Sequence, residues 1–284
     1  MPETAHILRL LCTCQPENIA LAETLAKGLG IDILELLEQE GFFELGIESP
    51  YGFKPQTLKG YFENIGVTNL NALKYFPKLT RLDCSGNKLE SLEGIQHLNN
   101  LQYLDCSNNQ IADLNTLEHL NNLQYLDCNT NNITDLEILK NLSHLQELYC
   151  YNNQISNLDA LQYLSNLKVL DCSSNQISDL NSLQGLARLH TLFCDDNQIS
   201  NLDALQGSTY LDFLECSSNQ ISDLNSLQGL AHLRVLFCHK NKISNLDALQ
   251  NATKLKYLDC SNNPIPDTQI QAFKATHPNC EIKF

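Results

Sequence analysis

The chain has 284 residues, with 18 Lys and Arg against 33 Asp and Glu, and a net charge of −15. This acidic balance repels phosphate groups, so it argues against nucleic-acid binding and against docking on an anionic membrane. No apolar run reaches the length of a membrane span. The charge favours a partner with a basic surface, mainly by raising the rate of association in a salt-dependent way.

Residues 1–56 are expected to form a helical region and a linker. Apolar residues recur at helical spacing after Pro16, and Gly28 or Gly30 would end that helix. A second short helix is predicted from Asp32 to Gly41, before a packed linker rich in Gly, Pro and aromatic residues. The first residues lack the basic segment of a signal peptide, so no signal peptide is expected.

The chain contains twelve cysteines. Without a secretion signal, this number favours a reducing compartment over a disulfide scaffold. Cys12 and Cys14 form a bare CxC motif, and no second pair stands nearby at the spacing of a zinc site. We therefore predict neither a metal site nor another cofactor.

A repeat of 22 residues follows. Residues 57–78 hold a degenerate copy that keeps the apolar phase, but its strand half, LKGYFENI, is expected to be off frame by about one residue. Nine regular copies span residues 79–265. An asparagine recurs at one position in all nine copies: Asn87, Asn109, Asn131, Asn153, Asn175, Asn197, Asn219, Asn241 and Asn263. A buried turn needs such side-chain amides to satisfy backbone groups that no strand reaches.

The consensus LxxLxCxxNxIxxLxxLxxLxx resembles the leucine-rich-repeat signature, with cysteine in place of the third leucine. The 22-residue length and the NQIxxLxxLxxL half are most similar to the bacterial internalin-like class. The resemblance implies an α/β fold: a curved, right-handed leucine-rich-repeat solenoid with a parallel sheet on its concave face. Because an open end would expose the core, we expect a helical N-terminal cap and a helix-strand C-terminal cap.

Nine cysteines occupy one position of the repeat. Side chains alternate along a strand, so Leu104 and Cys106 share the buried face and Asp105 points the other way. A buried thiol has a raised pKa and low reactivity, and one sulfur per strand does not converge as a metal site requires. We predict that all nine are core residues: Cys84, Cys106, Cys128, Cys150, Cys172, Cys194, Cys216, Cys238 and Cys260.

Residues 266–284 depart from the repeat and are expected to form the C-terminal cap. A short helix is predicted from Asp267 to about Ala275. An edge strand should follow, with Cys280, Ile282 and Phe284 alternating inward.

The outward strand positions form three columns on the sheet, before the second leucine of each repeat, between that leucine and the cysteine, and after the cysteine. Aromatic side chains exposed to water lower solubility, so their presence calls for a functional explanation. Exposed aromatic side chains surrounded by acidic residues are typical of a protein-binding surface. The alternative is that curvature half-covers the rings and that nothing binds. The predicted partner-binding residues are Asp83, Asp105, Asp127, Tyr103, Tyr125, Tyr149, Tyr151, Phe193, Phe213, Val235, Phe237, His239 and Tyr257.

Residues 172–206 and 216–250 match at 29 of 35 positions, which indicates a recent duplication of 44 residues. The six differences lie on or beside the concave side, and no core leucine, cysteine or repeated asparagine differs. Drift at exposed sites gives the same pattern, so the duplication supports a variable binding face only weakly.

No enzymatic activity is predicted. Asp195, Ser217 and His239 fall in one column of three consecutive repeats, but the first and last are then about 10 Å apart at the backbone, a loose fit for a triad whose members must touch. Cys238 and His239 point to opposite faces of a strand. The chain also lacks a phosphate loop, HExxH and GxSxG.

These features predict a non-enzymatic module that binds the basic and apolar surface of a protein partner through the concave face of the solenoid. The resemblance suggests a bacterial protein, expected either in the cytoplasm as a scaffold or as a secreted effector without a cleaved signal peptide. Capped ends favour a monomer. The alternative is a structural spacer, or a self-associating solenoid with no specific ligand.

Overall fold

The computed structural model describes residues 3, 16–31, 59–61 and 69–284. The chain divides into two compact units, Met1–Asn132 and Ile133–Phe284. The predicted helix at 32–41 and the CxC motif of Cys12 and Cys14 lie outside the described residues.

The described part of the first unit contains a helix and parallel strands. The helix α2 (Pro16–Leu29) ends before Gly30, whose φ of +67° is the left-handed conformation that glycine adopts without strain. The predicted helix and its glycine stop are therefore confirmed. The strands are β1 (Lys59–Tyr61), β2 (Arg81–Asp83), β3 (Tyr103–Asp105) and β4 (Tyr125–Asp127), and the 3₁₀ helices are η1 (Asn71–Tyr75) and η2 (Asn115–Leu117).

The strand of the degenerate repeat is in frame, so the expected one-residue offset is wrong. Lys59 pairs with Arg81 and Gly60 with Leu82 in the parallel ladder of β1 and β2, a spacing of 22 residues. Gly60 stands where strands β2 to β10 carry leucine, and this replacement hides the frame in the sequence. Backbone hydrogen bonds set the register whatever the side chain at that position.

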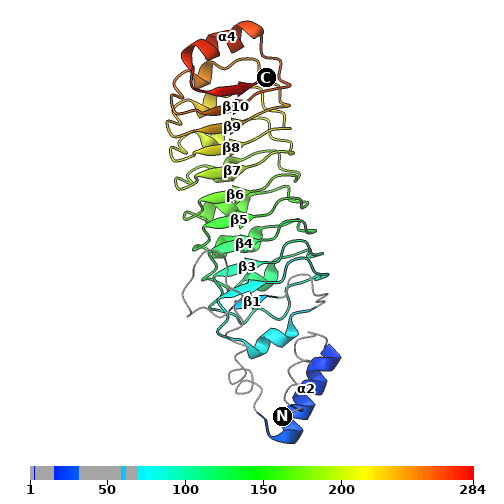
Figure 1. Ribbon diagram of the computed structural model, residues 1–284. Helices are drawn as coiled ribbons and strands as arrows, with labels where there is room; N and C mark the ends of the chain where they lie inside the picture. Colours follow the sequence, from blue (N-terminus) through cyan, green and yellow to red (C-terminus); the bar gives the residue numbers. More distant parts are fainter. Residues whose placement is uncertain (1–2, 4–15, 32–58, 62–68) are drawn as a thin grey trace. The chain divides into compact units, whose positions relative to one another are not determined.

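The second unit stacks short parallel strands. From β5 to β10, each strand is connected to the next through a 3₁₀ segment, and β10 is connected to β11 through α4. In Figure 1, the labelled strands β5 to β10 lie one above the next, and α4 follows beyond β10. The strands are β5 (Glu147–Tyr149), β6 (Val169–Asp171), β7 (Thr191–Phe193), β8 (Phe213–Glu215), β9 (Val235–Phe237), β10 (Tyr257–Asp259) and β11 (Glu281–Lys283). The helices are η3 (Glu137–Asn141), η4 (Asp159–Tyr163), η5 (Asn181–Leu183), η6 (Asp203–Leu205), η7 (Asn225–Leu227), η8 (Asp247–Leu249) and α4 (Asp267–Thr276).

The core consists of the repeated apolar positions. The central leucine of each strand from β2 to β10 is buried, as are the leucines of the 3₁₀ segments and all nine repeat cysteines. The parallel pairing within each unit, together with this burial, confirms the predicted leucine-rich-repeat architecture. Several thiols also donate to the next strand: Cys172 Sγ lies 3.4 Å from the carbonyl oxygen of Phe193, and Cys216 Sγ lies 3.4 Å from that of Phe237.

The repeated asparagines hold the turn after each strand. Asn219 donates through Nδ2 to the carbonyl oxygens of Cys194 and Cys216, at 2.9 and 3.2 Å, and its Oδ1 accepts the amide of Ile199 at 2.9 Å. The same bonds recur at Asn241 and, in the first unit, at Asn109. A side chain thus satisfies backbone groups that the strand ladder leaves open.

One column of the repeat has a left-handed backbone, which was not among the predictions made from the sequence. The residue two places after each repeat cysteine has a φ between 50° and 65°: Gly86, Asn108, Thr130, Asn152, Ser174, Asp196, Ser218, Lys240 and Asn262. Gly, Asn and Asp accept this conformation readily, whereas Thr130 and Lys240 adopt it at a cost of about 1 kcal/mol. The signal was present in the Asn and Gly content of this column.

The C-terminal cap is a helix and a strand, as predicted. Strand β11 pairs in parallel with β10, with Tyr257 opposite Glu281. The inward alternation expected for Cys280, Ile282 and Phe284 does not hold, because Phe284 is 53 % exposed and the other two are only half-buried. No further repeat packs on this edge strand among the described residues, and the buried contacts of the cap come from α4 instead, through Ile270 and Phe273.

The repeat thiols are expected to resist modification in the native protein. Burial raises the pKa of every repeat cysteine that shows a shift, and that of Cys260, beside the cap, reaches about 11. Because the thiolate is the reactive form, a maleimide reagent at pH 7 should leave Cys84, Cys106 and Cys172 unlabelled until denaturant unfolds the chain. Peptide mass spectrometry would measure this, with half-exposed Cys280 as the internal positive control. Rapid native labelling of most repeat thiols would contradict the prediction.

Candidate partner-binding surface

In each unit, the outward side chains of the strands form a surface, which we call the sheet face of that unit. On each of β2 to β9, the central leucine is buried and the residues on either side are half-buried. This burial follows from the alternation of side chains along a strand. The predicted aromatic residues of the strands therefore lie on the sheet face and are each partly accessible to solvent.

In the first unit, the sheet face carries two stacked tyrosines. The rings of Tyr103 and Tyr125 lie 4.2 Å apart between centroids, at an interplanar angle of 11°, and the guanidinium of Arg81 lies 3.7 Å from the Tyr103 centroid. Burial raises the pKa of both phenols. Both phenols are therefore uncharged, and the guanidinium of Arg81 covers one face of the stacked pair.

The three aspartates beside these tyrosines bond to the turn that follows each strand. Asp83 Oδ1 accepts the amide of Ser85 at 3.1 Å and its hydroxyl at 2.7 Å, and Asp105 bonds to Ser107 in the same way. Asp127 accepts the amide two residues on, at 3.0 Å. These are Asx turns, so the carboxylates have a structural task besides any contact with a partner. In the sequence, the recurring Asp-Cys-Ser triplet indicates these turns.

In the second unit, four rings form a continuous row that we call the aromatic strip: Phe193, Phe213, Phe237 and Tyr257. Their successive centroid distances are 4.8, 5.8 and 5.0 Å. Val235, opposite Phe213 in the ladder of β8 and β9, is half-buried beside them. Five of the predicted residues are thus brought together, from four consecutive strands.

The remaining predicted residues of this unit lie on the sheet face or at its rim. Tyr149 is half-buried and donates its hydroxyl to Glu147 at 3.0 Å, and Tyr151 is 40 % exposed. The side chain of His239 is 30 % exposed, with Nδ1 at 4.0 Å from Asp259 Oδ2 and without a hydrogen-bond partner.

The column after the cysteine was expected to face outward, but four of its five serines are buried, and Ser261 is half-buried. Ser85, Ser107, Ser173 and Ser217 are buried. The reason is visible at Ser173, whose hydroxyl donates to Asp195 of the next repeat at 2.5 Å. The chain turns into the left-handed residue directly after this column, and small hydroxyl side chains fold back against the neighbouring turn.

One residue of the sheet face was not selected from the sequence. Glu215 pairs with Phe193 on one side and Phe237 on the other in the strand ladder, and its carboxylate accepts the amide of Ser217 at 3.0 Å. Burial raises its pKa to about 7, with a smaller contribution from Asp195 and Asp259, against the hydrogen bonds from Ser217. The signal was the alternation of ring and acid in the middle column: Tyr149, Asp171, Phe193, Glu215, Phe237 and Asp259.

The structure does not assemble a catalytic triad from the column of Asp195, Ser217 and His239. Ser217 Oγ accepts the backbone amide of His239 at 3.1 Å rather than bonding to its imidazole. Asp195 bonds to a serine of the preceding repeat instead. Within the described ranges, no group of three or more His, Cys, Asp or Glu side chains is placed to hold a metal ion.

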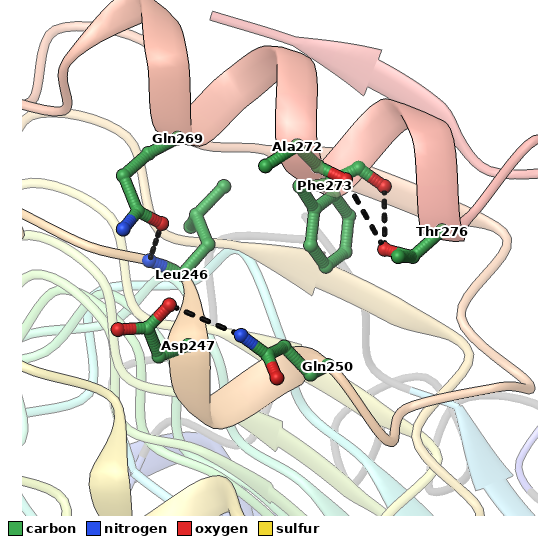
Figure 2. Close-up of a pocket in the computed structure, with 7 residues that line it drawn as sticks. All are labelled: Leu246, Asp247, Gln250, Gln269, Ala272, Phe273 and Thr276. Atoms are coloured by element: carbon green, nitrogen blue, oxygen red, sulfur yellow. Dashed lines mark hydrogen bonds between the residues drawn. The ribbon is translucent and has the colours of Figure 1, made fainter.

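A small pocket of about 210 Å³ lies where the C-terminal helix meets the last repeat (Figure 2). Gln269 Oε1 faces the backbone amide of Leu246 at 3.5 Å, and Gln250 donates to Asp247 at 3.2 Å. The hydroxyl of Thr276 donates to the helix backbone at 3.0 Å. These polar groups are thus occupied by hydrogen bonds within the cap and the adjoining repeat, so we assign the pocket to the packing of the cap and not to a ligand.

In the part of the chain that is described, no helix is long and apolar enough to cross a membrane.

Comparison with known families identifies the repeat. The family profile described as Leucine Rich repeats (2 copies) matches residues 77–119, 99–143, 121–163, 143–185, 165–207, 209–251 and 231–275. No curated protein sequence gives a significant match.

Solved structures of bacterial proteins are similar to this chain. A leucine-rich-repeat protein of Leptospira interrogans is 26% identical, with a TM-score of 0.73, over 78% of this chain and 59% of that one. The functional domain of InlJ from Listeria monocytogenes, which includes a cysteine ladder, is 30% identical, with a TM-score of 0.70, over 76% and 46%. Internalin C2 from the same organism is 33% identical, with a TM-score of 0.59, over 63% and 78%. The chain thus spans less than two thirds of the first two structures.

Proposed function

Since this chain belongs to the leucine-rich-repeat family, whose repeats form protein-interaction modules, we propose that it binds a protein partner through the concave face of its sheet. The observation that carries this proposal is the aromatic strip. Four half-buried rings from consecutive strands form an apolar row on a face that meets solvent. Rigid aromatic side chains of this kind are the usual anchors of protein interfaces.

The charge defines the chemistry of the partner. Acidic residues alternate with the rings of the second unit, and the whole chain carries a net charge of −15. A partner surface that combines apolar and basic side chains would fill the strip and gain from electrostatic steering. Such a module would act in the cytoplasm as a scaffold, or outside the producing cell as an effector. The similarity to internalin structures supports a bacterial setting.

The test is affinity capture from lysates of the producing cell and of a candidate host, at two salt concentrations. The wild-type bait is compared with a variant carrying Phe193→Ser, Phe213→Ser and Phe237→Ser, matched for folding by circular dichroism. We expect at least one protein to be retained by the wild type, to be lost from the variant, and to be retained less at high salt. The lysate that supplies it separates the scaffold from the effector.

A matched control variant replaces two exposed aromatic side chains that lie outside the strands. Tyr163, in η4, is 57 % exposed and Tyr210 is 55 % exposed. A variant with Tyr163→Ser and Tyr210→Ser should retain the same proteins as the wild type. If the strip variant and the wild type retain the same proteins, or if neither retains any, the spacer or self-association alternative is favoured instead.

A further inference from the structure

Glu215 is a half-buried acid without a counter-ion. Among the described residues it takes part in no ion pair, whereas Asp259 pairs with Lys283 at 2.9 Å and Asp212 pairs with Arg234. Its hydrogen-bond partner is Ser217, two residues on, through the backbone amide. A carboxylate held in this way is oriented, but its charge is not neutralised.

Three phenylalanines are the neighbours of Glu215 on the sheet face. Phe193 and Phe237 flank Glu215 across the ladder, on β7 and β9, and Phe213 lies two residues before it on the same face of β8. The rings of Phe193 and Phe237 are each within 6 Å, between centroids, of the Phe213 ring. Phenyl faces attract cations, and more strongly where water is partly excluded. A cation at this position would meet an opposite charge and ring faces together.

We propose that Glu215, Phe193, Phe213 and Phe237 form a recognition site for one cationic side chain, lysine or arginine, of the protein partner. The inference rests on the proposed function and adds the chemistry of one contact to it. Asp195 and Asp259 stand on either side and increase the negative potential at the site. The aliphatic stem of lysine or arginine would pack on the rings while its charged end reaches the carboxylate.

The middle column supplies a matched site that lacks part of this arrangement. Asp171 lies between Tyr149 and Phe193 in the ladder, two strands before Glu215. Its side chain is one methylene shorter, and the residue two places before it is Val169 instead of phenylalanine. Asp171 thus shares the column and the charge of Glu215 but has one ring fewer beside it.

The site should bind its cation more tightly as the pH rises. The pKa of Glu215 is raised to about 7 in the free protein, so near pH 6 a proton competes with the cation and near pH 8 it does not. The other charged or titratable groups around the site are Asp195 and Asp259, the imidazole of His239, which lies 4.0 Å from Asp259, and Lys283, which pairs with Asp259 at 2.9 Å. Because these groups share the surroundings of Glu215, the pH dependence must be compared between the wild type and Glu215→Gln.

The experiment selects peptides and then measures coupling. A random displayed-peptide library is panned on the full-length protein at pH 8, and binders are kept only if the triple Phe→Ser variant loses them. In each selected peptide, every Lys or Arg is replaced in turn by norleucine, and affinities for wild type and Glu215→Gln are measured by fluorescence anisotropy. For one basic residue we expect a loss of about tenfold on wild type and less than twofold on Glu215→Gln.

The same peptides should bind Asp171→Asn with coupling below twofold, and their affinity for wild type should fall about fivefold between pH 8 and pH 6, a fall that Glu215→Gln removes. Strip-dependent peptides that show no coupling to Glu215 would overturn this inference and leave the proposed function standing. A library that yields no strip-dependent peptide would overturn both.

Discussion

Asn241→Ala should destabilise the protein by about 3 kcal/mol, the largest loss that we expect from one substitution. Asn241 is 9 % exposed and bridges two repeats. Its Nδ2 donates to the carbonyl oxygens of Cys216 and Cys238, at 3.0 and 3.1 Å, and its Oδ1 accepts the amide of Ile221 at 2.9 Å. Alanine supplies none of these bonds, and each buried group left unsatisfied costs about 1 to 3 kcal/mol. Urea unfolding followed by circular dichroism would measure the loss.

The control is Asn251→Ala, which changes an exposed asparagine of the same repeat. A surface substitution of this kind should remain within about 0.5 kcal/mol of the wild type. If Asn241→Ala were equally mild, the turn would be held by the strand ladder and the packing of leucines, and the repeated asparagine would have no major role in stability.

The repeat could be predicted from the sequence because its code is local and redundant. Leucine, cysteine and asparagine recur at fixed phases, and each phase corresponds to one environment: strand centre, strand end or turn. The buried thiols follow from alternation along a strand, and the helix before Gly30 follows from its glycine stop. Nine copies of one pattern outweigh a deviation in any single copy.

What could not be predicted depends on contacts between repeats. Gly60 lacks the leucine that marks the frame, and only its ladder with Leu82 shows that the strand is in register. From the sequence, the serines after the cysteine were expected to face outward, but in the structure their hydroxyls bond to acidic side chains. Phe284 was expected to point inward, but it follows the edge strand β11 and is exposed, because no further coil packs on that edge within the described residues.

The residues that form the aromatic strip could be predicted from the sequence, but the environment of the acid among them could not. The column positions of Phe193, Phe213 and Phe237 follow from the repeat, so their place on the sheet face could be derived from the sequence. The environment of Glu215 could not, because its desolvation depends on how closely rings from neighbouring strands approach it. The alternation of ring and acid in the middle column marks the position of Glu215, but Asp171 and Asp259 share that pattern, so it does not give the degree of desolvation.

Glu215→Gln should stabilise the protein at pH 8 and have almost no effect at pH 4. The pKa of this carboxyl is raised from the ordinary 4.5 to about 7, so the folded state holds a proton that the unfolded state releases between these values. By linkage, stability then falls as pH rises from 4.5 to 7, and the full penalty remains above 7. Glutamine carries no charge to desolvate, and it can still accept the amide of Ser217.

The expected gain at pH 8 is about 1 to 2 kcal/mol, since half-exposure reduces the roughly 3 kcal/mol that the full pKa difference would represent. Urea midpoints of the two proteins, measured between pH 4 and pH 9, should diverge across the interval from 4.5 to 7. Asp212→Asn is the control of opposite sign, because Arg234 lowers the pKa of Asp212 and its loss should destabilise the protein above pH 4. Parallel midpoints for wild type and Glu215→Gln at every pH would show that water reaches the carboxylate freely and that the rings do not desolvate it.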